Sequence, residues 1–338
     1  MAQNNHNGKW LGHLAVLTVY IIFGVNPNCS KAVVPEYITP EAYTALRLLV
    51  GAAGFWLISL FTPRERVTRR DMGIIVLGAV SLYGTLWAFA EAMRYISPTY
   101  VSLISAMSPL VVMLMAALFL KEPITTRKAL GVFFGIAGAL MMILFSLHGD
   151  AHYSNKGALL CFVNILFYAT YLLITRAISP KYSPVTMMKW MFLFSFVLSL
   201  PLAIPTVKDS PLLLGTAPAM AYVNMGIVAI FATVIAYYLL PVALRRLRPT
   251  TVSMYSNLQP LVTAALAIAV GQDVFTWNKP VALILVIFGV FLVTTSRAKD
   301  DVRRLGPRRH CVVQEKYVVR RYCSVYVNRL EYPASSKA

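Results

Sequence analysis

Hydroxyl side chains and a proline share one helical stripe in the first half of the chain, a pattern suited to holding a polar solute. Ser102, Ser105 and Pro109 fall within a narrow stripe of a helix with 3.6 residues per turn. Hydroxyls donate and accept hydrogen bonds, and a proline inside a helix leaves one backbone carbonyl without its partner. These groups could therefore line a polar cavity. The alternative is that small residues permit close helix packing while the hydroxyls bond to their own backbone.

The same stripe recurs in the second half. At a constant offset of 151 positions (253 minus 102), the copy carries Ser253, Ser256 and Pro260. Asn257 and Gln259 add larger polar groups that packing alone does not require, so we favour the cavity interpretation. A duplicated apolar segment with polar groups at matched positions predicts an internally repeated transport protein.

Aromatic and amide side chains in other apolar segments are further candidates for contact with a substrate. They repeat at helical spacing, and rings suit the flat or apolar parts of a solute while their polar tips orient it. The candidates of this kind are Asn26, Tyr83, Trp87, Asn164, Tyr168 and Tyr238.

Charges inside apolar segments are few and therefore informative. Arg47 and Glu91 lie at similar expected depths, and each alone would cost about 2.5–3.5 kcal/mol on insertion scales, which favours pairing or a water-filled cavity. One hypothesis is that Arg47 binds a substrate carboxylate and that Glu91 carries a coupling proton. A structural Arg47–Glu91 ion pair is the alternative.

The elements that must position these residues are membrane helices. The chain has 338 residues, of which 58% are hydrophobic and 13% charged. Apolar runs of membrane-spanning length follow one another, and the alternation of a lipid-facing β-barrel is absent, so we predict an all-α integral membrane protein. The ten expected spans are 11–31, 41–61, 73–92, 98–120, 129–147, 157–175, 185–205, 219–240, 250–270 and 279–296.

An odd number of spans per half makes equivalent helices run in opposite directions. We therefore predict two inverted five-helix repeats, residues 10–147 and 157–296, followed by a basic cytoplasmic tail at 297–338. Exchanging the conformations of two such halves would open a central cavity to each side in turn. Basic residues concentrate in the loops on one side, which predicts that both termini are cytoplasmic.

Other function classes fit the sequence less well. The net charge of +18 would indicate nucleic acid in a soluble protein, but here it follows topology and the tail, so we expect no nucleic-acid partner. The four cysteines lack zinc-ligand spacing, and no catalytic constellation is visible, so we expect no metal, no cofactor and no enzyme activity. A non-transporting membrane protein or an intramembrane enzyme on a duplicated scaffold remains the alternative.

The repeated segment resembles the EamA-type family of the drug/metabolite transporter superfamily. The resemblance rests on Ala92-x-Arg94-Tyr95, on Ser102 and Pro109, on Lys121-Glu122-Pro123, and on the copy from Ala243 through Pro260. Phe23-Gly24-Val25-Asn26 is similar to the first-helix element of that family, with Phe in place of Trp. The likeness covers residues 10 to 296.

This resemblance implies a ten-helix carrier in a bacterial inner membrane. It implies export of amino acids or related small metabolites by alternating access, with the lipid bilayer as surroundings. The small-residue face Gly131-x3-Gly135-x2-Gly138 is typical of helix packing, so the oligomeric state is expected to be a monomer or a homodimer.

Overall fold

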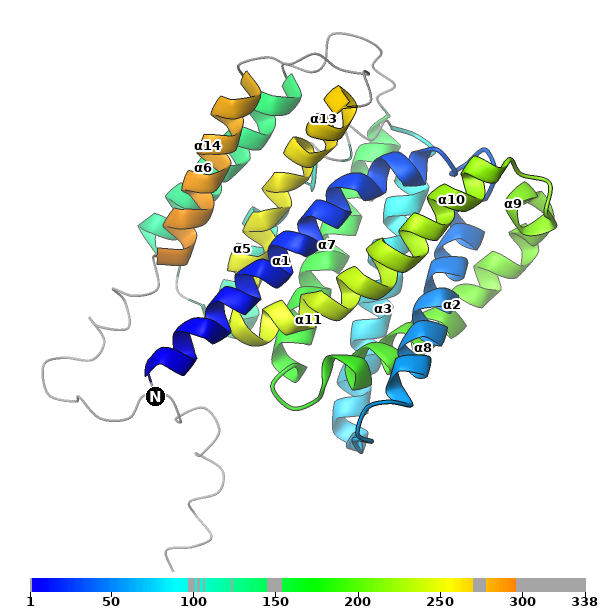
Figure 1. Cartoon of the computed structure of the whole chain (residues 1–338), viewed down its shortest axis with the longest axis horizontal. Helices are drawn as coiled ribbons and strands as arrows, with labels where there is room; N and C mark the ends of the chain where they lie inside the picture. Colours follow the sequence, from blue (N-terminus) through cyan, green and yellow to red (C-terminus); the bar gives the residue numbers. More distant parts are fainter. Residues whose placement is uncertain are drawn as a thin grey trace, which may run out of the picture. The chain divides into compact units, whose positions relative to one another are not determined.

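A computed structural model describes residues 2–96, 101, 104–105, 107–122, 124–144, 154–269 and 278–295, and within them every regular element is a helix (Figure 1). Residues Met1–Thr294 form one compact unit. The predicted tail at 297–338 lies outside the described residues. The all-helical class predicted from the sequence is confirmed for the described part of the chain.

The described elements include short 3-10 and π segments as well as α-helices. In chain order they are α1 (Ala2–Lys31), α2 (Pro40–Ser59), α3 (Arg69–Ala92), α5 (Ser108–Leu120), α6 (Thr126–Leu144), α7 (Asn155–Ile178), α8 (Pro184–Ala203), η1 (Ile204–Asp209), α9 (Pro211–Leu214), α10 (Ala219–Ile227), η2 (Val228–Ile235), α11 (Ala236–Arg246), α12 (Pro249–Met254), η3 (Tyr255–Leu258), α13 (Gln259–Ala269) and α14 (Asn278–Thr295).

Hydroxyl residues start three of the long helices. The side chain of Thr39 accepts a hydrogen bond from a backbone N–H in the first turn of α2, and Thr68 and Ser183 do the same for α3 and α8. These bonds satisfy N–H groups that have no partner within the helix. Proline follows the cap in α2 and α8, where its missing N–H costs nothing.

Six described helices are long and apolar enough to cross a membrane. They are Trp10–Lys31, Pro40–Ser59, Arg69–Ala92, Asn155–Ile178, Pro184–Asp209 and Ala219–Arg246. Large apolar side chains also stay exposed on shorter helices, with Leu118 of α5 at 73% and Ile284 of α14 at 66%. A surface of this kind is stable in lipid and not in water.

Helices from the two halves of the chain pack against each other. Within the compact unit, α3 lies against α7, α2 against α8, α1 against α11 and α13, and α5 against α12. Helices α6 and α14 run side by side in Figure 1, and a Cβ on Gly131 would come within 2.7 Å of the carbonyl oxygen of Gly289. The small-residue face of α6 therefore serves close helix packing within the chain, as the sequence predicts.

Two membrane segments depart from the regular helix expected at 219–240 and 250–270. Between α10 and α11, η2 is a π-helix, in which the Thr233 hydroxyl donates to the Val228 carbonyl five residues earlier. Ahead of Pro260, η3 is a 3-10 turn, since Pro260 has no N–H for the carbonyl of Ser256. Pro109 lies in the first turn of α5 instead of inside a longer helix.

Candidate functional site

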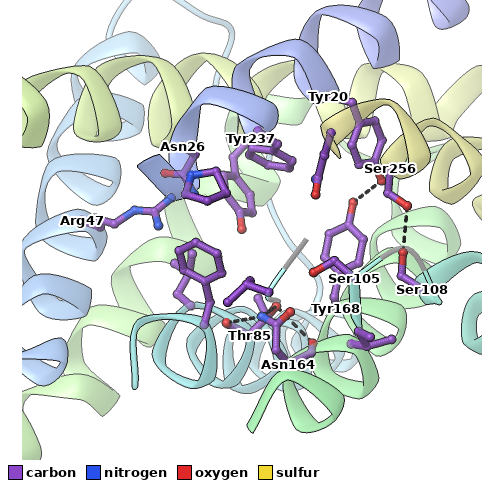
Figure 2. Close-up of a pocket in the computed structure, with 17 residues that line it drawn as sticks. Tyr20, Asn26, Arg47, Thr85, Ser105, Ser108, Asn164, Tyr168, Tyr237 and Ser256 are labelled. Carbon is purple, nitrogen blue, oxygen red and sulfur yellow. Dashed lines mark hydrogen bonds between the residues drawn. The ribbon is translucent and has the colours of Figure 1, made fainter. Parts of the chain in front are cut away.

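A central cavity of about 90 Å³ opens between helices of both halves (Figure 2). Its wall combines hydroxyl, amide and aromatic side chains with one arginine. The lining residues are Tyr20, Phe23, Asn26, Pro27, Arg47, Thr85, Leu86, Phe89, Val101, Ser105, Ser108, Asn164, Ile165, Tyr168, Tyr237, Ser256 and Gln259.

Arg47 is the charged residue of this wall among the described residues. Its side chain extends from α2 and is only 1% exposed. Nε donates to the Thr233 hydroxyl at 3.0 Å, Nη2 donates to the Ala232 carbonyl at 3.3 Å, and the guanidinium lies 5.5 Å from the Tyr43 ring centroid. Both hydrogen-bond acceptors belong to the π segment η2. That irregular segment therefore holds a buried cation, in agreement with the frequent occurrence of π-bulges at functional sites.

Hydroxyl groups from the two halves meet across the cavity. The Tyr20 and Tyr168 hydroxyls are 2.6 Å apart, and the Oγ atoms of Ser108 and Ser256 are 2.9 Å apart, as the dashed lines in Figure 2 show. Ser256 is the residue of the duplicated stripe that most clearly supports a polar cavity. Ser253 instead donates to a backbone carbonyl one turn earlier, which is the packing alternative.

Thr85 of α3 and Asn164 of α7 form a second polar contact in the wall. The Asn164 amide nitrogen donates to the Thr85 carbonyl at 2.6 Å and contacts the Thr85 hydroxyl at 2.9 Å. This double contact ties the two helices together where they pass the cavity. It also fixes the Asn164 side chain, so its orientation is set before any ligand binds.

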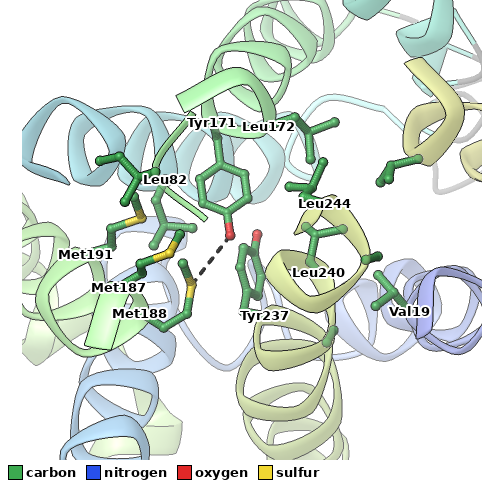
Figure 3. Packing of buried hydrophobic residues seen from close by; sticks show 14 of the residues in the cluster. Val19, Leu82, Tyr171, Leu172, Met187, Met188, Met191, Tyr237, Leu240 and Leu244 are labelled. Carbon is green, nitrogen blue, oxygen red and sulfur yellow. Dashed lines mark hydrogen bonds between the residues drawn. The ribbon is translucent and has the colours of Figure 1, made fainter. Parts of the chain in front are cut away.

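An apolar cluster surrounds the cavity residue Tyr237 (Figure 3). The Tyr237 ring contacts those of Tyr171 and Phe192, with centroids 5.7 and 5.4 Å apart. Leu240 and Leu244 continue the cluster along α11, and methionines of α8 pack beside it. Tyr237 thus lies between the polar cavity and the apolar core, and the close packing of that core excludes water on its side of the cavity.

Six of the residues predicted from the sequence to contact a substrate line this cavity: Asn26, Arg47, Ser105, Asn164, Tyr168 and Ser256. Eight described ones do not: Tyr83, Trp87, Glu91, Pro109, Tyr238, Ser253, Asn257 and Pro260. Ser102 lies outside the described residues. Asn257 is fully buried beside Gly135, away from the cavity wall, with its amide unpaired among the described residues.

Tyr238, which the sequence predicts as a contact residue, lies outside the cavity wall. It is 40% exposed, whereas its neighbour Tyr237 is buried and lines the cavity. Tyr238 lies 151 positions after Trp87 (238 minus 87), so the two occupy equivalent positions in the duplicated halves. The neighbouring pair at the same offset, Leu86 and Tyr237 (237 minus 86 is 151), lines the cavity, so equivalent helices of the two halves present equivalent positions to it. Trp87 itself is half-buried and lies outside the cavity wall.

The predicted alternative of an Arg47–Glu91 ion pair is wrong. Glu91 accepts a hydrogen bond from the Tyr95 hydroxyl at 3.2 Å and pairs with Arg94 at 3.4 Å. Arg94 also pairs with Glu41 at 3.2 Å. Glu91 therefore belongs to a charged cluster at the end of α3, and Arg47 keeps its buried charge without a carboxylate from the described residues.

Several cavity residues were not predicted from the sequence. Tyr20, Thr85 and Tyr237 lie in apolar segments where many tyrosines and threonines have the same local pattern. Ser108 had a usable signal, since it follows Ser105 at i+3 on the same stripe. The others become recognisable only when the helices are placed against each other.

Comparison with known proteins agrees with the duplication. The family model described as "EamA-like transporter family" matches the chain twice, at residues 10–144 and 155–295. The chain belongs to the EamA-like transporter family. With its apolar helices, family membership makes it a multi-pass membrane protein of the transporter class.

Relatives of the EamA-like chain carry transporter names as well. It is similar to "Uncharacterized transporter YyaM" of Bacillus subtilis (strain 168), with 25% identity over 82% of this chain and 92% of the relative. "Uncharacterized transporter YetK" of the same organism is 21% identical over 86% and 88%. A solved crystal structure shares the fold, with a TM-score of 0.67 and 16% identity over 89% of this chain and 99% of the other.

Proposed function

We propose that the chain carries small metabolites of amino-acid size across a membrane by alternating access. The observation that carries this proposal is one polar cavity built from both repeats, with Ser108 of the first and Ser256 of the second in direct contact. A volume of about 90 Å³ is below the roughly 300–1,000 Å³ of drug-sized ligand pockets, which favours a small solute.

The proposed architecture is ten helices in two inverted repeats, residues 10–147 and 157–296, with the tail at 297–338. Its support is that contacts recur when the halves are exchanged. Lys31, in the last turn of α1, donates from Nζ to the Met93 carbonyl at 2.6 Å. Arg176, in the last turn of the equivalent helix α7, donates to the carbonyl of Leu244, which lies 151 positions after Met93 (244 minus 93). Likewise α3 against α7 corresponds to α11 against α1. Such pairing is the basis for two states of similar energy.

We further propose that the chain exports its substrate through a bacterial inner membrane. Both termini are cytoplasmic in this proposal, and transport is coupled to protons. The loop charges support the orientation. Glu91 is the proposed proton carrier, since it is 7% exposed and lies next to Arg94 and Tyr95, whose contacts change if it is protonated. We propose no cofactor, and either a monomer or a homodimer.

Flux from proteoliposomes tests the proposed function. Vesicles containing the purified protein are loaded with a defined mixture of amino acids, hydroxy acids, amines and sugars, and release is followed by mass spectrometry with and without a pH gradient. Saturable release above that of protein-free vesicles is expected for at least one compound class. Absence of protein-dependent release for every class would contradict a carrier.

Reporter fusions test the inverted repeats separately. A reporter at Asp150 is expected outside the cytoplasm and one at Ala338 inside, because five crossings separate them. Both reporters on the same side would rule out this topology.

A further inference from the structure

Among the described residues, no carboxylate in the cavity compensates the buried charge of Arg47. A guanidinium has five N–H donors, and the hydrogen bonds to Thr233 and Ala232 use two of them. Figure 2 shows the guanidinium directed from α2 toward the cavity beside Asn26. The remaining donors are available to a ligand, and a buried cation without a counter-ion is stabilised when an anion binds.

For a positively charged group on the ligand, the described part of the cavity wall provides no carboxylate. Seven acidic residues are described, and none of them lines the cavity: they are Glu36, Glu41, Glu65, Asp71, Glu91, Glu122 and Asp209. Four of these acids are in ion pairs with Arg94, Lys181 or Lys128. The segment 97–106, which contributes Val101 and Ser105 to the wall, contains no acid in the sequence.

A cavity wall with a buried cation and no described acid should bind two kinds of carboxylate solute differently. In a zwitterionic amino acid, the ammonium lies close to its own carboxylate and would be repelled by Arg47 across a cavity of low dielectric. A hydroxy acid with the same carbon skeleton keeps the attraction and loses the repulsion. The Tyr20–Tyr168 and Ser108–Ser256 hydroxyl pairs, on the other side of the cavity in the view of Figure 2, can bind neutral polar groups of the ligand.

Resting on the proposed transport function, we propose that the cavity selects small organic anions, namely carboxylates with hydroxyl or carbonyl groups and no ammonium, over zwitterionic amino acids. Arg47 binds the carboxylate. Asn26 and the hydroxyl pairs bind the neutral remainder.

Matched pairs of solutes test this selectivity in the vesicles described above. The probes are lactate against alanine, glycerate against serine, and 2-hydroxyisocaproate against leucine, all at one concentration and pH 7.5, with release from protein-free vesicles subtracted. Among the pairs and the wider mixture, compounds with net negative charge are expected to leave about tenfold faster than zwitterions of similar size. Equal or faster release of the amino acids would overturn the proposal while leaving transport established; release of no compound would refute transport itself.

Variants locate the selectivity at Arg47. Arg47→Gln is expected to slow anion release by about 30-fold or more, because a buried charged partner is lost. Arg47→Lys retains the charge and is expected to keep the preference for anions at a lower rate, and it carries the test if Arg47→Gln is not monodisperse in size-exclusion chromatography. Lys189→Gln is the matched control. It removes a cation that lies 5.2 Å from the Trp56 ring centroid, outside the cavity wall, and should leave release unchanged. Anion release by Arg47→Gln at the rate of Lys189→Gln would contradict the assignment.

Discussion

Replacing Thr233 by valine tests how the buried arginine is held. Thr233 is fully buried, and its hydroxyl accepts a hydrogen bond from Arg47 Nε at 3.0 Å while donating to the Val228 carbonyl at 3.1 Å. Valine has nearly the same shape, so Thr233→Val removes the hydroxyl without opening a cavity. The Arg47 donor then loses its partner where water has little access.

The expected loss of stability follows from the charge on the donor. Hydrogen bonds to charged groups contribute about 1.5–3 kcal/mol, and a buried donor left without a partner costs its desolvation as well. Thr233→Val should therefore lower the free energy of unfolding by about 1.5–3 kcal/mol. Most of this loss should vanish in an Arg47→Met background, because no guanidinium remains to be satisfied.

Unfolding in mixed micelles, titrated with SDS and followed by tryptophan fluorescence, measures these differences. Thr170→Val is the matched control, because the exposed Thr170 hydroxyl bonds only to the carbonyl of Leu166 one turn earlier. It is expected to change stability by less than about 0.5 kcal/mol. If Thr233→Val is no more destabilising than Thr170→Val, the Thr233 hydroxyl does not stabilise the buried Arg47 and the reasoning is refuted.

Three further predictions address packing, the cavity face and a loop. Gly289→Ala should destabilise the protein by about 1–3 kcal/mol in the same unfolding assay, because the new Cβ would lie 2.6 Å from the backbone oxygen of Gly131 in α6. Gly226→Ala is the control and should be neutral or slightly stabilising, because a Cβ at that position meets no described atom within 4 Å. Tyr237→Ala should slow vesicle release about tenfold, equivalent to ~1.4 kcal/mol, whereas Tyr238→Ala should leave the release rate unchanged. Slower release by Tyr238→Ala than by Tyr237→Ala would contradict the placement of Tyr237 on the cavity face of α11. Burial alone would raise the pKa of Glu65, but hydrogen bonds from Ser183 and Thr186 lower this pKa below the ordinary value of 4.5. Glu65→Gln should therefore be less stable than wild type at pH 7. The difference in melting temperature between the two proteins should shrink as the pH falls below 4.5. A difference that grows on acidification would contradict the lowered pKa.

Local sequence patterns identified much of what positions the site. Apolar length and composition predicted the membrane-length helices of the described part of the chain. The constant offset between the two copies predicted the duplication that the family match shows. These properties depend on neighbours along the chain, so one sequence is sufficient to recognise them.

The face that each helix presents to the cavity was decided by tertiary structure. The duplication drew attention to Ser256, which lines the cavity, and to the pair Trp87 and Tyr238, which does not. The preceding pair at the same offset, Leu86 and Tyr237, lines the cavity instead. Arg47 was recognised as unusual, but its partners lie 185 and 186 positions away on η2 and not on the neighbouring Glu91.

The sequence by itself therefore determined that the chain folds as apolar helices in two related halves, with hydroxyls and one buried arginine as candidates for chemistry. The tertiary structure decided which of them share a cavity and which pair elsewhere. The physical reason is that helix formation follows from periodicity within a segment, whereas contact between helices depends on side-chain packing over the whole bundle.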